Sequence, residues 1–495
     1  MVTQVMTYEV IIGLEVHAQL RTRSKMFCRC SADYASAVAN THVCPVCLGM
    51  PGVLPVINRR AVEYAIMTAL ALNCAISEYT KFDRKNYPYP DLMKGYQISQ
   101  YDAPVGCNGW LDIEANGEEK RAGITRVHLE EDVAKLLHRN SGKEAYSLVD
   151  VNRSGVPLME IVGEPDLRSP EEARQYLMKL RTILQYLGVS TANMEEGSFR
   201  CDANISIRPE GTTELLAKVE VKNMNSFRAV YRALEYETER QKKAARDGER
   251  LVQETRGWVE DRGVTVSQRS KEFAHDYRYF PEPDLPPLTL DRKWVEEIRT
   301  KLPELPETRR NRFVSEYGLS LYDANLLTAS KALADYEEEF VAEGQSTALA
   351  KPEIPKLGSN WLLGEVSRIM NANNIDIDTF KDKVSPGRLV ELTVLNSQGT
   401  VSAATAKSVL EAMFRTGKSA AAIVSEQGLG QISDAGEIEG AIAEVIAANA
   451  QAVADFRVGK EPAIKFLVGQ VMRLTKGRAN PQVVTELLKK RLREE

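Results

Sequence analysis

The chain has 495 residues, of which 43% are hydrophobic and 27% charged, a globular composition that excludes a disordered or fibrous protein. Its 64 Lys and Arg against 69 Asp and Glu give a net charge of -5, so any binding of nucleic acid must use a local basic surface. No stretch approaches the roughly 18 apolar residues of a membrane span, and the first residues do not resemble a signal peptide. We expect a cytoplasmic protein without membrane contact.

The pattern along the chain changes twice. Residues 1–290 contain strand-like segments and glycine-bearing loops, and 279–288 then carries four prolines, which no regular element absorbs. From 291 the spacing of apolar residues is helical, with a second break expected near 396–399. These changes predict an α+β domain at 1–290 and two small all-helical domains at 291–396 and 397–495.

Two helices are predicted inside the first domain. Ser169 and Glu172 form a capping box with Pro170 at the first helical position, and Gly188 marks the end of that helix. A second long helix is expected over 226–247, closed by Gly248.

Five segments alternate with a period of two residues, which is typical of β-strands with one polar face. They are 12–20, 124–130, 157–162, 200–208 and 217–223. In the first, Leu14 and Val16 point to one face while Glu15 and His17 point to the other. The polar faces of the remaining segments carry Arg126, His128 and Glu130, then Glu160, then Asp202, Asn204, Ser206 and Arg208, and finally Lys218, Glu220 and Lys222.

For any single strand, a half-solvated sheet with a charged wet face is the alternative interpretation. Carboxylates, imidazoles and cations recur together on strand after strand, however, and a lone charge in the apolar run around Glu160 would cost on the order of several kcal/mol. Convergence of these strands would create a hard-cation site suited to Mg²⁺, with ligands Glu15, His17, Glu130, Glu160 and Asp202. Phosphate oxygens could be held by Lys218, Lys222, Arg126 and Arg208. The pattern is compatible with phosphoryl transfer, although the chain has no GxxxxGK[ST] loop.

Four of the seven cysteines form a cluster in the sequence. Cys28 and Cys30 precede Cys44 and Cys47, with 13 residues between the pairs, which resembles a four-thiolate zinc ribbon. Four thiolates fill a tetrahedron and leave no open position, so a zinc ion here would be structural. Four free thiols in a loop are the alternative, and the spacing favours zinc.

Two segments are candidates for RNA contact. Residues 81–101 mix four cations, including Lys85 and Lys94, with four tyrosines, so they could bind phosphates and stack on a base. From Arg457 onward ten Lys and Arg face four Glu, and candidate phosphate ligands there are Lys460, Lys465, Lys476 and Arg478. An ordinary surface loop and a solvated helical face are the respective alternatives.

Long motifs in this chain resemble those of the B subunit of bacterial tRNA-dependent amidotransferases. The similar segments are IGLEVHAQL at 12–20, CPVCLGMPG at 44–52, DRKNY at 83–87, DLMKGYQISQ at 91–100, DVNRSGVPLME at 150–160, VKNMNS at 221–226, and FLVGQVM at 466–472 with TKGRANP at 475–481. The resemblance covers essentially the whole chain.

The resemblance implies a cradle domain on an antiparallel sheet, a helical domain and a helical tail that contacts tRNA. It further implies ATP-dependent transamidation of Glu-tRNA(Gln), Asp-tRNA(Asn) or both, in which the side-chain carboxylate is phosphorylated and ammonia displaces the phosphate. The implied cofactors are ATP and Mg²⁺, beside the structural Zn²⁺ indicated by the cysteines. On this basis the catalytic residues are Glu15, His17, Glu130 and Lys222, and the nucleotide is bound by Arg126, Arg208, Lys218 and Asn223.

The chain shows no sequence signal for making ammonia itself. It has no Gly-Gly-Ser-Ser stretch with a preceding lysine and no persuasive Cys-His pairing among its five histidines. The resemblance accordingly implies a heterotrimer with an amidase A subunit and a small C subunit, tRNA as a partner, and a non-discriminating aminoacyl-tRNA synthetase as a further one. A non-catalytic tRNA-binding scaffold and a magnesium-dependent ligase for a free amino acid are the competing hypotheses.

Overall fold

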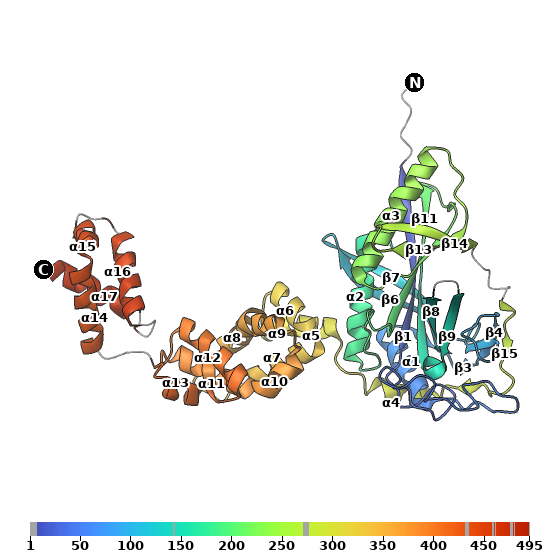
Figure 1. The fold of residues 1–495 in the computed structure, drawn as a ribbon, viewed down its shortest axis with the longest axis horizontal. Coiled ribbons are helices and arrows are strands. Elements are labelled where there is room, and N and C mark those ends of the chain that lie inside the picture. The colour runs from blue at the N-terminus through green and yellow to red at the C-terminus, as the bar shows by residue number, and fades with distance from the viewer. Residues whose placement is uncertain are drawn as a thin grey trace, which may run out of the picture. The chain divides into compact units, whose positions relative to one another are not determined.

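The computed structural model describes residues 7–141, 144–270, 277–430, 435–457, 460, 462–475, 479 and 481–494. Internal contacts divide the chain into two compact units, Met1–Leu305 and Pro306–Glu495. The first combines a large sheet with helices and the second is helical, so the predicted α+β class is confirmed (Figure 1). Among the described residues, no helix combines the length and apolarity needed to cross a bilayer.

The first unit is built on a nine-stranded sheet with the order β14-β13-β12-β11-β1-β10-β7-β6-β2. All five segments predicted as strands belong to it, and they are consecutive neighbours at its centre: β12 (Val219–Lys222), β11 (Phe199–Pro209), β1 (Tyr8–Gln19), β10 (Pro157–Gly163) and β7 (Glu118–Glu131). The outer strands are β14 (Val264–Ser270), β13 (Glu254–Val259), β6 (Gly106–Ala115) and β2 (Ala75–Ile76). The shared period-two pattern therefore marks the contiguous middle of one sheet.

The sheet is antiparallel except at one pair, because β12 and β13 run parallel. The helix α3 (Phe227–Arg246) connects these two strands, and a helical crossover returns the chain to the same end of a sheet. Both predicted helices are confirmed. The hydroxyl of Ser169 accepts from the N–H of Glu172 to begin α2 (Pro170–Tyr186), and Ser226 caps α3 in the same way.

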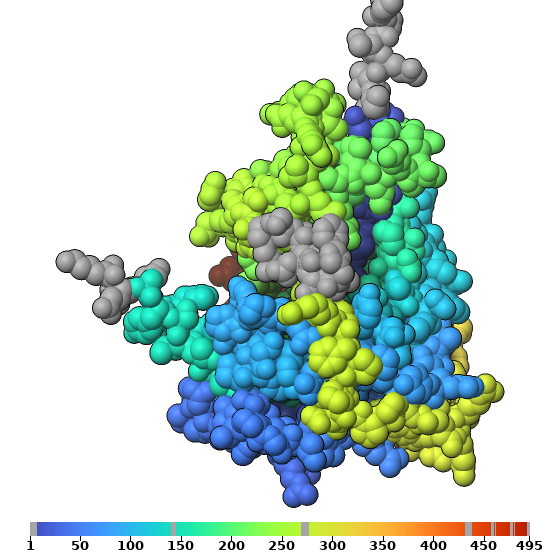
Figure 2. All heavy atoms as spheres, turned by 90° about the vertical axis from the view of Figure 1, so that its right-hand side faces the viewer, coloured from blue at the N-terminus to red at the C-terminus, as the bar shows by residue number. Residues whose placement is uncertain are grey.

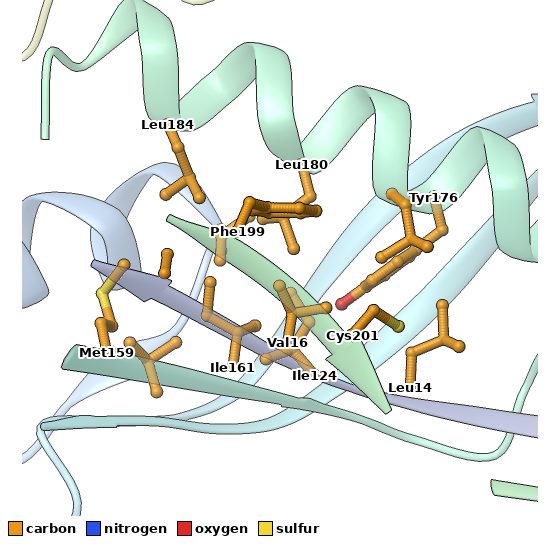
Figure 3. Close-up of a cluster of buried hydrophobic side chains, with 14 of the residues drawn as sticks. Leu14, Val16, Ile124, Met159, Ile161, Tyr176, Leu180, Leu184, Phe199 and Cys201 are labelled. Atoms are coloured by element: carbon orange, nitrogen blue, oxygen red, sulfur yellow. The ribbon is translucent and has the colours of Figure 1, made fainter. Parts of the chain in front are cut away.

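The two helices cover one face of the sheet and bury its apolar side chains. Leu14, Val16 and Ile161 are at most 1% exposed and belong to one core cluster with residues of both helices. Figure 3 shows them facing Leu180 and Leu184 of α2. Because successive side chains of a strand point to opposite faces, the polar residues of the same strands lie on the other face.

Shorter elements border this polar face. A small sheet joins β4 (Asp83–Asn86) and β5 (Tyr96–Ser99) to β15 (Phe280–Pro281), and β3 (Tyr79–Thr80) pairs with β16 (Leu288–Thr289). The proline-rich segment 279–288 is thus held across the loop 81–101, as the yellow chain over the blue segment in Figure 2 shows. The unit also contains α1 (Arg59–Ala71), the hairpin of β8 (Lys135–Ser141) and β9 (Glu144–Asp150), the 3₁₀ turn Val151–Arg153 and α4 (Arg292–Arg299).

The second unit has two separate buried cores. One contains residues between Phe313 and Ile423, and the other contains residues between Ile438 and Leu492. The helices of the first are α5 (Pro306–Ser315), α6 (Leu321–Thr328), α7 (Lys331–Gly344), the 3₁₀ turn Lys351–Glu353, α8 (Ile354–Trp361), the π-helical turn Leu362–Val366, α9 (Ser367–Asn373), α10 (Ile377–Lys383), α11 (Pro386–Ser397), α12 (Ala403–Thr416) and α13 (Ala420–Glu426). The helices of the second are α14 (Ala435–Ala448), α15 (Ala450–Arg457), α16 (Pro462–Leu474) and α17 (Pro481–Glu494).

The changes of core do not coincide with the domain boundaries predicted at 290 and 396. The first unit continues to Leu305 because Ile298 and Leu302 pack in its core. Leu392 and Val401 stand on either side of the second predicted break and share one core. Gly399, which is exposed and has a φ of 73°, turns the chain between α11 and α12, two helices that share this core. The glycine-bearing loop signalled a turn within a domain, and the core changes between 429 and 438.

A buried acid in α7 leads to a prediction about pH. Glu337 is 0% exposed, both its carboxylate oxygens lack hydrogen-bond partners among the described residues, and burial raises the pKa of its side chain well above 4.5. The folded state therefore binds the Glu337 proton more tightly than the unfolded state does. On this account the free energy of unfolding is highest below about pH 4.5 and falls as the pH rises toward the folded-state pKa. We expect Glu337→Met to raise the free energy of unfolding by about 1–3 kcal/mol, more at pH 8 than at pH 5, in urea titrations.

The exposed Glu339 of the same helix provides the control for this prediction. Glu339→Met is expected to change stability by less than about 0.5 kcal/mol at either pH. Equal stability of the wild type and Glu337→Met at both pH values would contradict the assignment of a buried neutral acid.

Candidate functional site

The register of the sheet aligns the polar residues of its central strands. Backbone pairing across four neighbouring strands creates two adjoining rows on the polar face. Opposed residues have Cβ atoms about 4.5–5.5 Å apart, so members of one row can share a ligand. The first row contains Arg200, His17, Glu160 and His128, and the second contains Asp202, Glu15, Val162 and Arg126.

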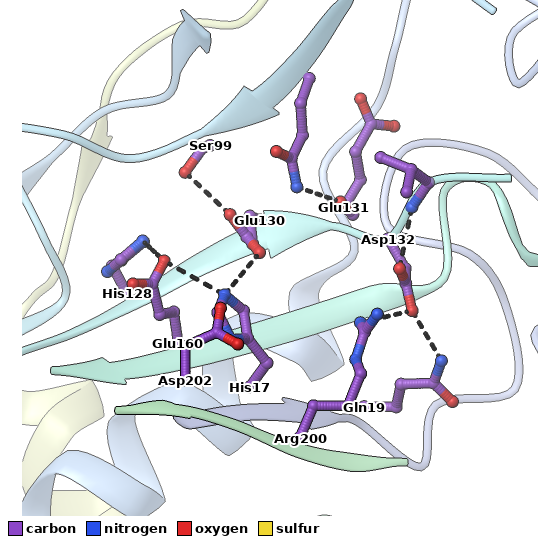
Figure 4. A network of polar contacts seen from close by, with 12 residues as sticks. His17, Gln19, Ser99, His128, Glu130, Glu131, Asp132, Glu160, Arg200 and Asp202 are labelled. Carbon is purple, nitrogen blue, oxygen red and sulfur yellow. Dashed lines mark hydrogen bonds and ion pairs between the residues drawn. The ribbon is translucent and has the colours of Figure 1, made fainter. Parts of the chain in front are cut away.

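His17, Glu130 and Glu160 form a compact cluster on this face (Figure 4). The Nε2 atom of His17 lies 3.6 Å from Glu130 Oε1 and 3.6 Å from Glu160 Oε2. His128 Nε2 lies 3.0 Å from the same Glu160 oxygen, and the hydroxyl of Ser99 donates to Glu130 Oε2 at 3.3 Å. Glu130 is 2% exposed and Glu160 8%, so two carboxylates are buried side by side.

The charges of the cluster are set by its neighbours. Burial alone would raise the pKa of Glu160, but His128, His17 and Lys85 hold it well below its ordinary value. Burial would also lower the pKa of Lys85, whereas the nearby Glu130 and Glu160 raise it. Around neutral pH the site therefore holds an ionised Glu160 and a charged Lys85.

The cluster borders a cavity of about 360 Å³. On one wall Lys222 donates to Asp202, and Asp202, Glu220 and Glu15 together raise the pKa of Lys222 to about 12 against the effect of burial. Buried carboxylates and cations on facing walls can bind an anion together with a divalent cation. The cavity is also lined by Lys85, Tyr87, Gln97, Asp132, Arg200 and Asn223.

Asp132 organises a second polar network at the cavity (Figure 4). Its Oδ2 atom accepts from Gln19 Nε2 at 2.7 Å and from Arg200 Nη2 at 2.9 Å. Burial would raise the pKa of Asp132, but Arg200 and Arg153 lower it. The ionised Asp132 thus fixes the guanidinium of Arg200 at the cavity wall. Sequence reasoning assigned no role in the site to Asp132, Arg200 and Gln19, although Gln19 continues the alternation of Glu15 and His17.

Some predicted residues have other partners. Glu15 and Asp202 belong to the second row and lie outside the three-residue cluster. Glu15 accepts from Asn204 Nδ2 at 2.7 Å, and Asp202 accepts from Lys222. Arg208 donates to Glu9 at 2.7 Å. Metal ligation by Glu15 and Asp202, and nucleotide binding by Arg126, Arg208, Lys218 and Asn223, stay predictions.

Two contributions to the site come from the segments laid across the sheet. β4 places Lys85 over the carboxylates, with its Nζ 4.9 Å from the ring centroid of Tyr277. Tyr279 stacks on Tyr101 with centroids 4.3 Å apart. Sequence reasoning missed this aromatic wall, because no periodicity links residues 277–279 to the loop around Lys85. It also assigned no role to His128, which shares its predicted polar face with Glu130.

The four clustered cysteines meet as predicted. Their sulfur atoms all lie within 4.8 Å of one another, with Cys47 Sγ 3.7 Å from Cys44 Sγ and 4.0 Å from Cys30 Sγ. Thiolates at about 2.3 Å from one tetrahedral zinc are about 3.8 Å apart, so the four groups fit this ion. The Cys28 thiol, the backbone N–H of Cys44 and Lys25 lower the pKa of Cys47 against the effect of burial. A bound zinc ion stays a prediction.

The predicted RNA contacts in the first unit are engaged with carboxylates. Lys94 forms an ion pair with Glu131, whose Oε1 also accepts from the N–H of Ile98 at 3.0 Å. Lys85 faces Glu130 and Glu160 as described above. Both amines therefore interact with carboxylates of the first unit itself, and their contact with RNA stays a prediction.

The predicted RNA contacts in the tail are only partly described. Lys465 is exposed on α16, and Lys460 is exposed but forms an ion pair with Asp455 at 3.0 Å. Lys476 and Arg478 lie outside the described residues. Contact of these cations with RNA also stays a prediction.

Comparisons with known proteins identify the family. Residues 10–296 match the family described as the GatB/GatE catalytic domain, and residues 343–492 match the GatB domain. The chain belongs to the GatB/GatE family. This confirms the resemblance found in the motifs.

Relatives of this family are similar over the full length. The chain is 64% identical over 488 residues to a protein of Dehalococcoides mccartyi strain CBDB1, covering 98% of this chain and 99% of that protein. It is 56% identical over 489 residues to a protein of Thermomicrobium roseum, covering 99% of each. It is 55% identical over 486 residues to a protein of Carboxydothermus hydrogenoformans, covering 98% and 99%. All three are named as the B subunit of an aspartyl/glutamyl-tRNA(Asn/Gln) amidotransferase.

Proposed function

We propose that this chain is the subunit of a tRNA amidotransferase that converts the side chain of a misacylated tRNA into its amide. The observation that carries the proposal is the buried cluster of His17, Glu130 and Glu160, which faces Lys85 at a cavity on the sheet. ATP transfers its terminal phosphoryl group to a carboxylate oxygen of Glu-tRNA(Gln), Asp-tRNA(Asn) or both, and ADP leaves. Ammonia then forms the C–N bond as the C–O bond to phosphate breaks.

The donor set of the cluster fits a divalent cation. Two ligands at about 2.1 Å from one Mg²⁺ can be up to about 4.2 Å apart, and His17 Nε2 lies 3.6 Å from one oxygen of each glutamate. Bound here, Mg²⁺ would neutralise phosphate charge during the transfer. We propose His17, Glu130 and Glu160 as its protein ligands, and Glu15 and Asp202 of the adjoining row as the remaining members of the predicted set.

The cations of the cavity have separate tasks in this proposal. The raised pKa of Lys85 keeps its amine charged, so Lys85 stabilises negative charge and does not act as a base. Lys222, held by Asp202, and Arg200, held by Asp132, orient phosphate oxygens from two further walls. Lys222 and Arg200 are fixed by carboxylates before any ligand arrives, which reduces the reorganisation that the reaction requires.

Partners are needed because ammonia must reach the acyl phosphate unprotonated. Free ammonia is mostly protonated at neutral pH, so a path sealed from water is required. We propose that a partner amidase A subunit supplies it and that a small C subunit completes a heterotrimer. A tRNA partner and a non-discriminating aminoacyl-tRNA synthetase follow from the same reaction. The four-cysteine group is proposed to hold a structural zinc ion.

The deciding experiment supplies ammonium chloride in place of the amidase. The chain, purified with its C subunit, is incubated with ATP, Mg²⁺ and either Glu-tRNA(Gln) or Asp-tRNA(Asn), and the amino acid released from the tRNA is analysed. Glutamine or asparagine supports the proposal and names the substrate. Tight tRNA binding without amide, also after addition of the A subunit, would favour a non-catalytic scaffold. Amide formation from free glutamate or aspartate alone would favour a ligase that needs no tRNA.

The exposed cations of the tail lead to a prediction about tRNA binding. Lys465 on α16 and Lys490 on α17 are exposed. If both contact phosphate, Lys465→Gln with Lys490→Gln should lower the slope of log affinity against log salt by about 1.4–1.8. Filter binding at several salt concentrations measures this slope. Lys301→Gln, an exposed lysine of the first unit, is the matched control and should leave it unchanged. An unchanged slope in the double variant would exclude these cations as phosphate contacts.

A further inference from the structure

A chain of hydrogen bonds connects the segment between the two cysteine pairs to the cavity beside the carboxylate cluster. It runs from Tyr34 through Gln19 and Asp132 to Arg200. We propose that Tyr34 and Gln19 are positioning residues of the transfer reaction, which hold Asp132 so that Arg200 keeps an N–H group available for a phosphate oxygen. The inference rests on the proposed function and adds to it two residues that do not line the cavity.

The two oxygens of Asp132 have separate partners (Figure 4). Oδ1 accepts from the backbone N–H of Val133 at 2.9 Å, and Arg153 Nε lies 3.7 Å from it. Oδ2 accepts from Gln19 Nε2 at 2.7 Å and from Arg200 Nη2 at 2.9 Å. Asp132 is 2% exposed, so these protein groups, and not bulk water, determine where its oxygens lie.

The guanidinium of Arg200 binds this carboxylate with only one arm. Its Nη2 donates to Asp132, whereas its Nε is buried and has no hydrogen-bond partner among the described residues. An arginine and a carboxylate commonly form two parallel bonds, and a buried N–H without a partner is costly. Gln19 and the N–H of Val133 occupy acceptor positions on the two oxygens, which accounts for the single bond. Without Gln19, Arg200 would satisfy its Nε on Asp132 and turn away from the cavity.

Tyr34 in turn fixes the side chain of Gln19. Gln19 is the last residue of β1, and a long side chain at the end of a strand has many rotamers unless it is bound. Because an ionised carboxylate only accepts, Gln19 Nε2 must face Asp132. The same Nε2 donates to the hydroxyl of Tyr34 at 3.0 Å, and this hydroxyl donates to Gln19 Oε1 at 3.1 Å. Tyr34 therefore holds both ends of the amide.

Tyr34 can hold Gln19 because its own segment, residues 31–43, is anchored by other residues. Three hydrogen bonds of 2.8 Å attach this segment to the 3₁₀ turn Val151–Arg153: from the N–H of Val151 to Asn40 Oδ1, from Asn152 Nδ2 to the carbonyl of Val38, and from the N–H of His42 to Asn152 Oδ1. None of them involves Tyr34. Loss of the Tyr34 hydroxyl should therefore release Gln19 and leave the segment in place.

The test measures kcat and KM in the ammonium chloride assay described above. Tyr34→Phe removes only the hydroxyl and should lower kcat about fivefold, while the KM for aminoacyl-tRNA and the midpoint of urea unfolding stay unchanged. Gln19→Leu should lower kcat at least about tenfold. Tyr231→Phe is the matched control, because the Tyr231 hydroxyl also donates to a side chain, that of Glu235 at 3.4 Å, on α3 at the other face of the sheet. It should keep full turnover.

A double-mutant cycle with Arg200 separates positioning from a structural role. Arg200→Met keeps a long side chain but removes its donors, and should lower kcat about a hundredfold. In that background Tyr34→Phe should have no further effect, because the group that it positions is absent. A fivefold loss that persists there would show that Tyr34 acts by another route and overturn the inference. If Gln19→Leu does not fold, Tyr34→Phe and the cycle carry the test alone.

Failure of this inference differs from failure of the proposed function. Full turnover by Tyr34→Phe or by Arg200→Met, in a wild type that forms the amide, overturns the inference alone. A wild type that forms no amide, also after addition of the A subunit, overturns the proposed function and this inference with it.

Discussion

Replacing Glu130 by Gln is expected to reduce amide formation at least about a hundredfold while tRNA affinity stays within about twofold. The carboxylate is 2% exposed, lies 3.6 Å from His17 Nε2 and is the strongest of the influences that keep Lys85 charged. Glutamine keeps its size and can still accept from Ser99, so the fold should persist. The negative charge is lost, and with it one proposed metal ligand. Single-turnover assays with ammonium chloride measure the effect.

Glu119→Gln is the matched control, because Glu119 is an exposed glutamate on the same strand, β7. It should leave turnover and tRNA binding unchanged. Full turnover by Glu130→Gln would remove the cluster from the chemistry and support the scaffold hypothesis. Loss of turnover together with loss of tRNA binding would instead indicate that Glu130 supports the structure of the RNA-binding surface.

The centre of the sheet could be predicted from the sequence because its constraints are local. A strand with one buried face must alternate, and Leu14 and Val16 against Glu15 and His17 report this alternation directly. The register follows once neighbouring strands bury their apolar residues against the same helices. The alternation alone, without any sequence motif, therefore predicted that His17, Glu130 and Glu160 lie together, as the structure shows.

The rest of the site depends on contacts that no local pattern encodes. Lys85 and Ser99 reach the cluster because β4 and β5 fold over the sheet, and β15, almost 200 residues later in the chain, pairs with β4. The ion pair of Asp132 and Arg200 joins the residue that directly follows β7 to β11, and β7 and β11 are not adjacent strands. The same limit explains why the boundary predicted near 396 differs from the change of core. A glycine-bearing loop such as 396–399 has the same sequence pattern whether it joins two helices of one core or two separate cores.

Replacing Cys47 by Ser is expected to remove bound zinc and to destabilise the first unit by several kcal/mol, on the order of a structural zinc site. The segment around the cysteines has little core of its own: Val38, Leu54 and Val56 are 69–76% exposed. Its ordering must therefore come from the four sulfur atoms and a few bonds, such as that from Lys25 Nζ to the carbonyl of His42 at 2.8 Å. A serine hydroxyl is a poor zinc ligand at neutral pH because it stays protonated.

Metal analysis of the purified chain and thermal unfolding with and without a chelator test this prediction together. The wild type should contain about one zinc per chain and lose stability with the chelator, whereas Cys47→Ser should already be destabilised and respond little. Cys107→Ser, which changes a cysteine on β6 outside the group, should keep both the zinc and the chelator response. A wild type that contains no zinc and whose stability does not change with the chelator would contradict the zinc site and favour four free thiols. Cys47 also lines a cavity with Lys94 and Glu131, which form an ion pair. Glu131 directly follows Glu130 on β7. If zinc is bound, its loss in Cys47→Ser should therefore lower turnover as well as stability.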